Sequence, residues 1–504
     1  AMTVKLRPDG PLPVAIANFR LATLDPAGTE QQAFMACTLL HEQWGLSTPT
    51  YRSRSVTFSF DPQFYFCKHG DPLPEGFDFD PGDGQGFRRV SPGDQLCVTY
   101  ASEGCVNATL RCGALESGFS LQLDAQPAPP PADELWQLQA VNGCRGTAYV
   151  YRAHGQSRLT RPMIVAEGFP GGYPCDYLYE MLNQHDTLET LRKAGYDLIL
   201  LSFANGMDLL QNNAQVMQAC IGRVMQRTAE PLVVSGVSMG GLVARYALAA
   251  METCGQAHNT RLFLTIDTPH RGAYTNLCNQ WFAQYFANAS PMAGGFSALL
   301  NSPANQQFVM SWFNGQSVQV SPLREQFIQA LAANGNYPQQ PRRLAIACGA
   351  GDGQRCLSSH QLALDWSGSP LAGARLWTLA ATGDACAVIA EGYSALADGS
   401  IADSLSDNSE LSWEGAPGGQ NLYNVYSASI AQAIGYGEAS APIGKTCAVP
   451  TVSALDLPGS PFEAIPAPER GLSPFDDYIC CETNQLHLQF TPKIKDWLLD
   501  QLTR

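Results

Sequence analysis

Several features that would assign a chain to another class of protein are absent from these 504 residues. No run approaches the roughly 18 apolar residues that a membrane-spanning helix needs, so no transmembrane segment is predicted. The zinc-site patterns CxxC, CxxH and HExxH do not occur, and we predict no metal. Positive charge is scarce, since 30 Lys and Arg oppose 45 Asp and Glu. The resulting net charge of −15 argues against nucleic acid or an anionic membrane surface as a partner.

Cysteine, in contrast, is abundant. The 16 cysteines are an even number and are spread over the whole length. Such a count favours disulfide bonds and therefore an oxidising compartment, although the buried thiols of a cytosolic enzyme would give the same count. We predict a secreted or periplasmic protein whose export signal was removed with the native leader.

A proline-rich segment divides the sequence. The linker QPAPPPADE, residues 126–134, contains four prolines and no periodic apolar pattern. Before it, short β-forming stretches such as SVTFSF and FSLQL alternate with Gly, Pro and Asp turns, which predicts a small all-β sandwich over 1–125. After it, apolar strands alternate with amphipathic helices. This predicts an α/β domain over 135–504, in which a mostly parallel sheet has helices on both faces.

The turn between one such strand and helix carries a serine. In PLVVSGVSMGGLVARYAL the pattern Gly-x-Ser-x-Gly occupies residues 236–240, with an apolar strand before it and a helix after it. Glycines two residues before and after the serine are needed because a Cβ there would collide in so sharp a turn. The serine hydroxyl then projects at the head of the helix. We predict that Ser238 is a nucleophile.

A serine nucleophile needs a base, and in this architecture the base comes last in the chain. Two histidines follow at a suitable distance, His360 and His487. His487 lies in a short loop directly ahead of a terminal helix, from which it can reach the carboxyl ends of the strands, and it is the predicted base. His270, in TIDTPHRGA, comes earlier and is predicted to hold a strand-end loop together through hydrogen bonds.

The acid that orients the base is predicted to be Asp352, which follows the buried strand LAIAC in a glycine-rich turn. Asp384 and Glu414 are the alternatives, and any of the three could instead be a turn residue. The oxyanion hole needs two backbone N–H groups. We predict that they come from Met239, directly after the nucleophile, and from Phe169 in the glycine-rich loop EGFPGG, because Pro170 has no N–H to donate.

These segments resemble the α/β-hydrolase superfamily, and within it the secreted lipase- and esterase-like serine hydrolases. The resemblance rests on EGFPGG, ANGMDLLQNNA, GVSMGGLVARYAL, TRLFLTIDTPHRGA and VPTVSALDL, which together span most of 160–490. It implies that Ser238, Asp352 and His487 are nucleophile, acid and base, with Phe169 and Met239 as oxyanion donors. Many lipases have His-Gly where this chain has Glu167-Gly168. The front segment, with FDFDPGDGQGFRRV, resembles a PKD-type β sandwich.

A long connection follows the TPHRG motif. The segment at about 274–340 contains WFAQYFA, MAGGFSALL, FVMSWF and REQFIQALAA, whose aromatic residues recur at helical spacing. We predict a helical cap over the active site; additional core is the alternative. The sequence as a whole predicts a serine carboxylic ester hydrolase that needs no cofactor and acts on esters with an apolar acyl or aromatic part, lipids and polyesters included. An amidase or peptidase with the same triad, or a non-catalytic adhesion protein, is the alternative.

Overall fold

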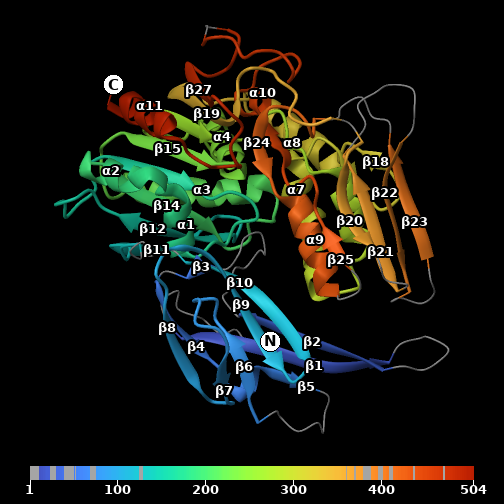
Figure 1. Cartoon of the computed structure of the whole chain (residues 1–504). Coiled ribbons are helices and arrows are strands. Elements are labelled where there is room, and N and C mark those ends of the chain that lie inside the picture. The colour runs from blue at the N-terminus through green and yellow to red at the C-terminus, as the bar shows by residue number, and fades with distance from the viewer. Residues whose placement is uncertain are drawn as a thin grey trace. The chain divides into compact units, whose positions relative to one another are not determined.

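The computed structural model describes most of the chain, which divides into two compact units, Ala1–Ala128 and Pro129–Arg504 (Figure 1). The division falls inside the proline-rich segment 126–134. The residues described are 11–22, 30–38, 50–51, 53–67, 75–123, 129–358, 360–367, 371–378, 387–395, 401–407, 413–434, 438–468 and 471–503.

The N-terminal unit consists of two β-sheets that share one apolar core. One sheet has the order β2-β1-β4-β8 with β5 also paired to β1, and the other has the order β3-β10-β9-β6-β7. Rings from both sheets meet in the core, where Phe58 and Phe79 pack edge to face with centroids 5.0 Å apart. The strands are β1 (Leu12–Ala22), β2 (Glu30–Thr38), β3 (Thr50–Tyr51), β4 (Ser55–Ser59), β5 (Tyr65–Cys67), β6 (Phe77–Asp80), β7 (Arg88–Val90), β8 (Gln95–Thr99), β9 (Gly104–Cys112) and β10 (Leu115–Leu123).

The second unit is built on an eight-stranded sheet with the order β11-β12-β14-β13-β15-β16-β19-β27. All neighbouring strands from β14 to β27 pair in parallel, and β12 runs antiparallel to both of its neighbours. The strands are β11 (Glu134–Gln139), β12 (Arg145–Tyr151), β13 (Pro162–Ala166), β14 (Asp197–Phe203), β15 (Leu232–Val237), β16 (Thr260–Ile266), β19 (Arg342–Ala350) and β27 (Asp477–Cys481). Five central strands are buried along almost their whole length, as expected when helices cover both faces.

Helices cover both faces of this sheet, and each face has its own apolar core. Alternate residues of the strands point to opposite sides, so Met163 and Val165 enter one core while Ile164 and Ala166 enter the other. The first core is completed by α1 (Cys175–Leu182), α2 (Thr187–Lys193) and α11 (Pro492–Thr503). The second is completed by α3 (Leu210–Met225), α4 (Met239–Thr253), α7 (Pro303–Phe308), α8 (Pro322–Ala333) and α10 (Thr451–Ala454).

The first insertion, residues 267–341 between β16 and β19, contains the segment predicted as a cap. It forms α5 (Leu277–Tyr285), α6 (Pro291–Leu300), α7, the short strands β17 (Trp312–Phe313) and β18 (Val318–Gln319), and α8. Its aromatic side chains are mostly buried. Phe308 and Phe327 join the core of the main sheet, whereas Trp281, Phe282 and Phe286 pack elsewhere.

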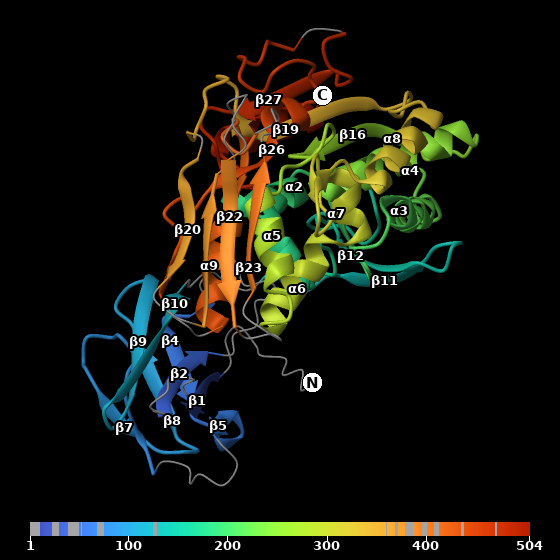
Figure 2. The ribbon, with the colours of Figure 1, turned by 90° about the vertical axis from the view of Figure 1, so that its right-hand side faces the viewer.

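The second insertion, residues 351–476 between β19 and β27, holds a five-stranded sheet that the sequence did not reveal. Its order is β23-β22-β21-β20-β25, and every pair in it is antiparallel. Figure 2 shows this sheet beside α5 and α9 (Tyr423–Ile434), and Phe286, which directly follows α5, contacts Trp366 of β20 at a centroid distance of 5.0 Å. The strands are β20 (Leu362–Ser367), β21 (Ala372–Trp377), β22 (Ala387–Ser394), β23 (Ile401–Asp407) and β25 (Glu438–Ser440); β24 (Gly418–Asn421) and β26 (Thr446–Pro450) form a separate pair.

The predicted disulfide bonds are not found among the cysteines that the structure describes, each of which carries a free thiol. The side chains of Cys37 and Cys67, and the whole of Cys386, lie outside this set. In the described part of the chain, no helix is long and apolar enough to cross a membrane. The same part contains no group of three or more His, Cys, Asp or Glu side chains that could hold a metal ion.

Candidate active site

Ser238 occupies a sharp turn between β15 and α4. Its backbone is strained, with φ of 52° and ψ of −124°, and the flanking glycines explain how the turn closes. A Cβ on Gly236 would lie 2.2 Å from the backbone of Gly240, and a Cβ on Gly240 would lie 2.3 Å from the carbonyl oxygen of Glu167. Only glycine fits at either position. The turn therefore has the geometry that the Gly-x-Ser-x-Gly pattern predicts, with the serine at the N-terminus of a helix.

His487 contacts Ser238 directly. Its Nε2 lies 2.8 Å from the Ser238 Oγ, and its side chain is 24% exposed, so a substrate can reach this face. The loop that carries it is fixed from two sides: the His487 N–H donates to the carbonyl of Gln420 in β24 and the Gln485 N–H donates to the carbonyl of Cys348 in β19. The base predicted from the loop ahead of the last helix thus lies beside the predicted nucleophile.

The carboxylate at the other side of the imidazole belongs to Asp267 and not to Asp352, the residue predicted for this place. The Asp267 Oδ2 lies 2.6 Å from the His487 Nδ1, and the side chain is completely buried. Its Oδ1 accepts the backbone N–H of Cys348 at 2.9 Å. Asp267 directly follows β16, the neighbour of β15, so the nucleophile and this carboxylate emerge side by side from adjacent parallel strands.

Of the three carboxylates named from the sequence, the two that the structure describes do not take this place. Asp352 is exposed and its Oδ1 caps the backbone N–H of Gln354, so it is a turn residue. Glu414 is buried near Cys278 and Cys447, and its charge contributes to the raised pKa of both thiols. Asp384 lies outside the described residues. One sequence signal did point to Asp267: an aspartate that immediately follows a buried strand, next in order after the strand that carries the serine.

The backbone N–H groups of Phe169 and Met239 are available for an oxyanion. Within the described residues neither donates a hydrogen bond. Met239 is the first residue of α4, where the N–H groups of a helix have no internal partner. The loop with Phe169 approaches the nucleophile closely, since a Cβ on Gly168 would lie 3.2 Å from the Ser238 Cβ. Two free donors beside a serine can stabilise a tetrahedral oxyanion.

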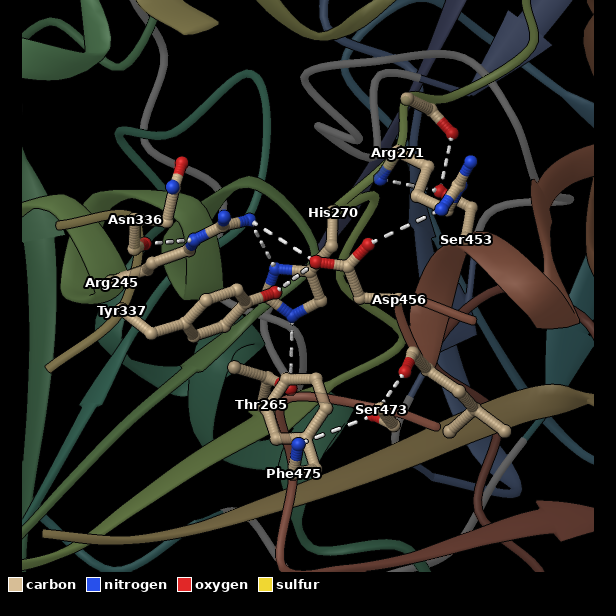
Figure 3. A network of polar contacts seen from close by, with 12 residues as sticks. Arg245, Thr265, His270, Arg271, Asn336, Tyr337, Ser453, Asp456, Ser473 and Phe475 are labelled. Atoms are coloured by element: carbon tan, nitrogen blue, oxygen red, sulfur yellow. Dashed lines mark hydrogen bonds and ion pairs between the residues drawn. The ribbon is translucent and has the colours of Figure 1, made fainter. Parts of the chain in front are cut away.

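A network of polar contacts supports the loop that follows Asp267 (Figure 3). Arg245 of α4 donates through Nη1 to the His270 Nδ1 at 3.3 Å and through Nε to the carbonyl of Asn336 at 2.6 Å. Because arginine can only donate, the Nδ1 of His270 must accept and its Nε2 carries the proton that faces the Thr265 hydroxyl at 3.2 Å. Desolvation, together with the Arg245 charge, holds the pKa of His270 well below its ordinary value. His270 is therefore a neutral structural residue, as expected from the sequence.

We expect His270→Phe to destabilise the fold and to have little effect on the chemistry of the site. The ring would still pack between Tyr337 and Phe475, but Thr265 and Arg245 would lose their imidazole partner, which costs about 1–3 kcal/mol. Thermal unfolding measures this effect. The control is His360→Asn, because His360 is exposed and asparagine tolerates its left-handed backbone, with φ of 54°. This variant loses only exposed contacts of the ring with Trp377 and with the Val388 carbonyl, so its stability should change by less than about 1 kcal/mol. Equal unfolding temperatures for the two variants would contradict the structural role of His270.

No protein-family model and no curated protein matches this sequence. Similar solved structures include the mature lipase BlEst2 of Bacillus licheniformis, which is 16% identical over 41% of this chain and 72% of the lipase, with a TM-score of 0.27. Est1E of Butyrivibrio proteoclasticus is 13% identical over 42% of this chain and 76% of its own, with a TM-score of 0.27. XC6422 of Xanthomonas campestris, described as an a/b serine hydrolase without lid, is 19% identical over 29% of this chain and 65% of its own, with a TM-score of 0.22.

Proposed function

We propose that this protein is a serine hydrolase that cleaves carboxylic esters through an acyl-enzyme intermediate. The observation that carries the proposal is a continuous relay of two hydrogen bonds. The Ser238 Oγ lies 2.8 Å from the Nε2 of His487, and the Nδ1 of His487 lies 2.6 Å from the buried Asp267 carboxylate. In this relay Ser238 is the nucleophile, His487 the general base and Asp267 the acid.

The relay accounts for each proton in the reaction. The Asp267 carboxylate accepts a hydrogen bond from the Nδ1–H of His487 and stays ionised, which leaves the unprotonated Nε2 to take the Ser238 proton. Attack of the serine oxygen on the ester carbonyl gives a tetrahedral oxyanion, to which Phe169 and Met239 would donate their free N–H groups. The imidazolium then protonates the leaving alcohol, and a water activated by the same His487 hydrolyses the acyl-enzyme. These steps draw on side chains and backbone groups of this chain.

The first insertion reaches the oxyanion loop and supports a role as a cap. Phe308 of α7 contacts the ring of Phe169 edge to face, with centroids 5.2 Å apart. At the end of the same loop, the ring of Tyr173 lies 5.2 Å from that of Tyr177, which is 46% exposed. Aromatic and apolar side chains around a serine nucleophile favour esters with an apolar acyl or aromatic part, and lipid or polyester substrates belong to that class.

The test is a panel of p-nitrophenyl esters with acyl chains of increasing length, together with matched p-nitroanilides and an organophosphonate that labels activated serines. We expect ester hydrolysis above the buffer rate and a single phosphonate adduct on Ser238 by intact mass and peptide mapping. Faster cleavage of anilides than of esters would instead assign an amidase. Absence of both turnover and labelling would leave a non-catalytic binding protein and refute the proposal.

A further inference from the structure

The side chain of Glu167 lies directly before the loop that carries Phe169, and no step above uses it. Glu167 follows β13 and is completely buried. It is followed by Gly168, whose position beside the Ser238 Cβ brings the loop to the nucleophile. A buried carboxylate without a charged partner is costly, so its contacts call for an explanation.

The carboxylate of Glu167 accepts three backbone hydrogen bonds. Its Oε1 accepts the N–H of Gly172 at 2.7 Å and that of Phe203, the last residue of β14, at 2.5 Å. Its Oε2 accepts the N–H of Tyr173 at 3.0 Å. Two of these donors belong to the loop and one to the sheet. A single side chain therefore ties the far end of the loop to the strand beside it.

The loop held in this way encloses the peptide of Phe169. The Tyr173 hydroxyl donates to the Phe169 carbonyl at 2.8 Å. Glu167 thus binds the backbone N–H of Tyr173, and the side chain of Tyr173 binds the backbone of Phe169. The neighbouring backbone packs tightly against this loop, since a Cβ on Gly206 would lie 2.1 Å from the carbonyl oxygen of Pro170. The direction of the Phe169 N–H thus depends on the contacts of Glu167.

We propose that Glu167 is a positioning residue for ester hydrolysis, whose carboxylate fixes the 168–173 loop so that the Phe169 N–H faces the oxyanion formed at Ser238. The inference rests on the proposed function. Glu167 does not touch the substrate; it acts through Gly172, Tyr173 and the loop between them.

The ionised form of Glu167 is the one that fixes the loop. A protonated carboxyl is uncharged and its O–H finds no acceptor among these three N–H groups, so it accepts their hydrogen bonds more weakly than the carboxylate does. Burial raises the pKa of Glu167 to about 7, against the lowering effect of the three N–H groups and of Ser202. The titratable groups around it are the phenols of Tyr149 and Tyr173, whose own pKa values are raised and which are therefore uncharged at neutral pH. The loop should lose its support as the pH falls through about 7.

Asp197 offers a matched control at the opposite end of the same sheet. This buried carboxylate begins β14 and accepts the backbone N–H groups of Ala153 at 2.9 Å, Thr160 at 2.6 Å and Arg161 at 2.9 Å. It therefore has the same chemistry as Glu167, but lies at the amino end of the strands, about 15 Å from the site by the length of β13.

The experiment compares Glu167→Ala and Glu167→Gln with Asp197→Ala and Asp197→Asn, using a p-nitrophenyl ester and the full chain. Wild-type turnover is measured first and tests the proposed function alone. We expect Glu167→Ala to lower kcat roughly 100-fold, as for a misaligned oxyanion donor, with KM within about threefold. Glu167→Gln, which keeps the shape but offers one acceptor oxygen, should lose about tenfold. Both Asp197 variants should unfold at lower temperature and keep the wild-type kcat.

The pH profile separates positioning from simple stability. In the wild type, the acid limb of the kcat profile should include the protonation of Glu167 near pH 7, which Glu167→Gln lacks, so the acid limb of the variant should be less steep. A kcat for Glu167→Ala within twofold of the wild type would overturn the inference. So would an equal loss of kcat in Asp197→Ala, or an acid limb in Glu167→Gln as steep as that of the wild type. If Glu167→Ala does not fold, the kcat and the acid limb of the nearly isosteric Glu167→Gln still test the inference.

Discussion

Ser238→Ala is expected to abolish ester hydrolysis, with a loss in kcat on the order of 10⁵-fold and an unchanged fold. The hydroxyl supplies the oxygen that attacks the ester, and neither His487 nor the oxyanion donors can replace it. Alanine fits the turn because Ser238 holds its conformation through the glycines around it, not through its side chain. Steady-state kinetics with a p-nitrophenyl ester, together with circular dichroism, measures both parts of this expectation.

The matched control is Ser235→Ala, three residues earlier on β15, the strand that leads to Ser238. The Ser235 hydroxyl is completely buried and has no hydrogen-bond partner among the described residues. Its removal should leave activity unchanged and stability unchanged or slightly higher, because an unpaired buried polar group is lost. Residual activity in Ser238→Ala similar to that of Ser235→Ala would show that another group is the nucleophile, and the proposed mechanism would then fall.

Asp267→Asn is expected to lower kcat about 10⁴-fold although the side chain keeps its shape. The amide oxygen can still accept the Cys348 N–H, so the Nδ2 group would face the Nδ1 of His487. That contact forces the imidazole into the tautomer whose Nε2 carries the proton. An Nε2–H group cannot accept the proton of Ser238, and the base is lost without any change in its position.

Asp352→Asn is the comparison that separates the acid observed in the structure from the acid predicted from the sequence. Asp352 is exposed and caps only the Gln354 N–H, a bond that asparagine can also make. We expect its kcat to stay within about twofold of the wild type, as for an ordinary surface substitution. The reverse order, with a severe loss in Asp352→Asn and a mild one in Asp267→Asn, would refute the assignment of the acid.

The sequence predicts best what is determined locally. The turn at Ser238 needs two glycines at fixed spacing, and both are visible within five residues. His487 could be found because its loop directly precedes the last helix. The acid could not be selected in the same way, because several carboxylates follow strands, and only the order of the strands in the sheet shows that β16 lies next to β15.

The sheet of the second insertion was missed for a similar reason. Trp366 of β20 packs against Phe282 and Phe286, which lie about 80 residues earlier, in α5 and directly after it. The apolar face of these strands is therefore covered by a helix from the first insertion. A single strand read by itself does not reveal that partner. The aromatic spacing in WFAQYFA indicated a helix correctly, but what covers that helix is a non-local property.

The order of the site residues along the chain has a consequence for how this protein can change in evolution. Ser238 precedes both long insertions, and Asp267 directly follows β16 at the very start of the first one. Duplication, exchange or trimming of the segments beyond Asp267 therefore leaves the proposed nucleophile and acid at the ends of adjacent strands. His487 comes after both insertions, and its loop is bonded to Gln420 of β24, inside the second one. Natural variants of this architecture should therefore differ in the sequence and length of β20–β23 and α5–α6. The short segment around β24 should be retained, because it holds the loop of His487.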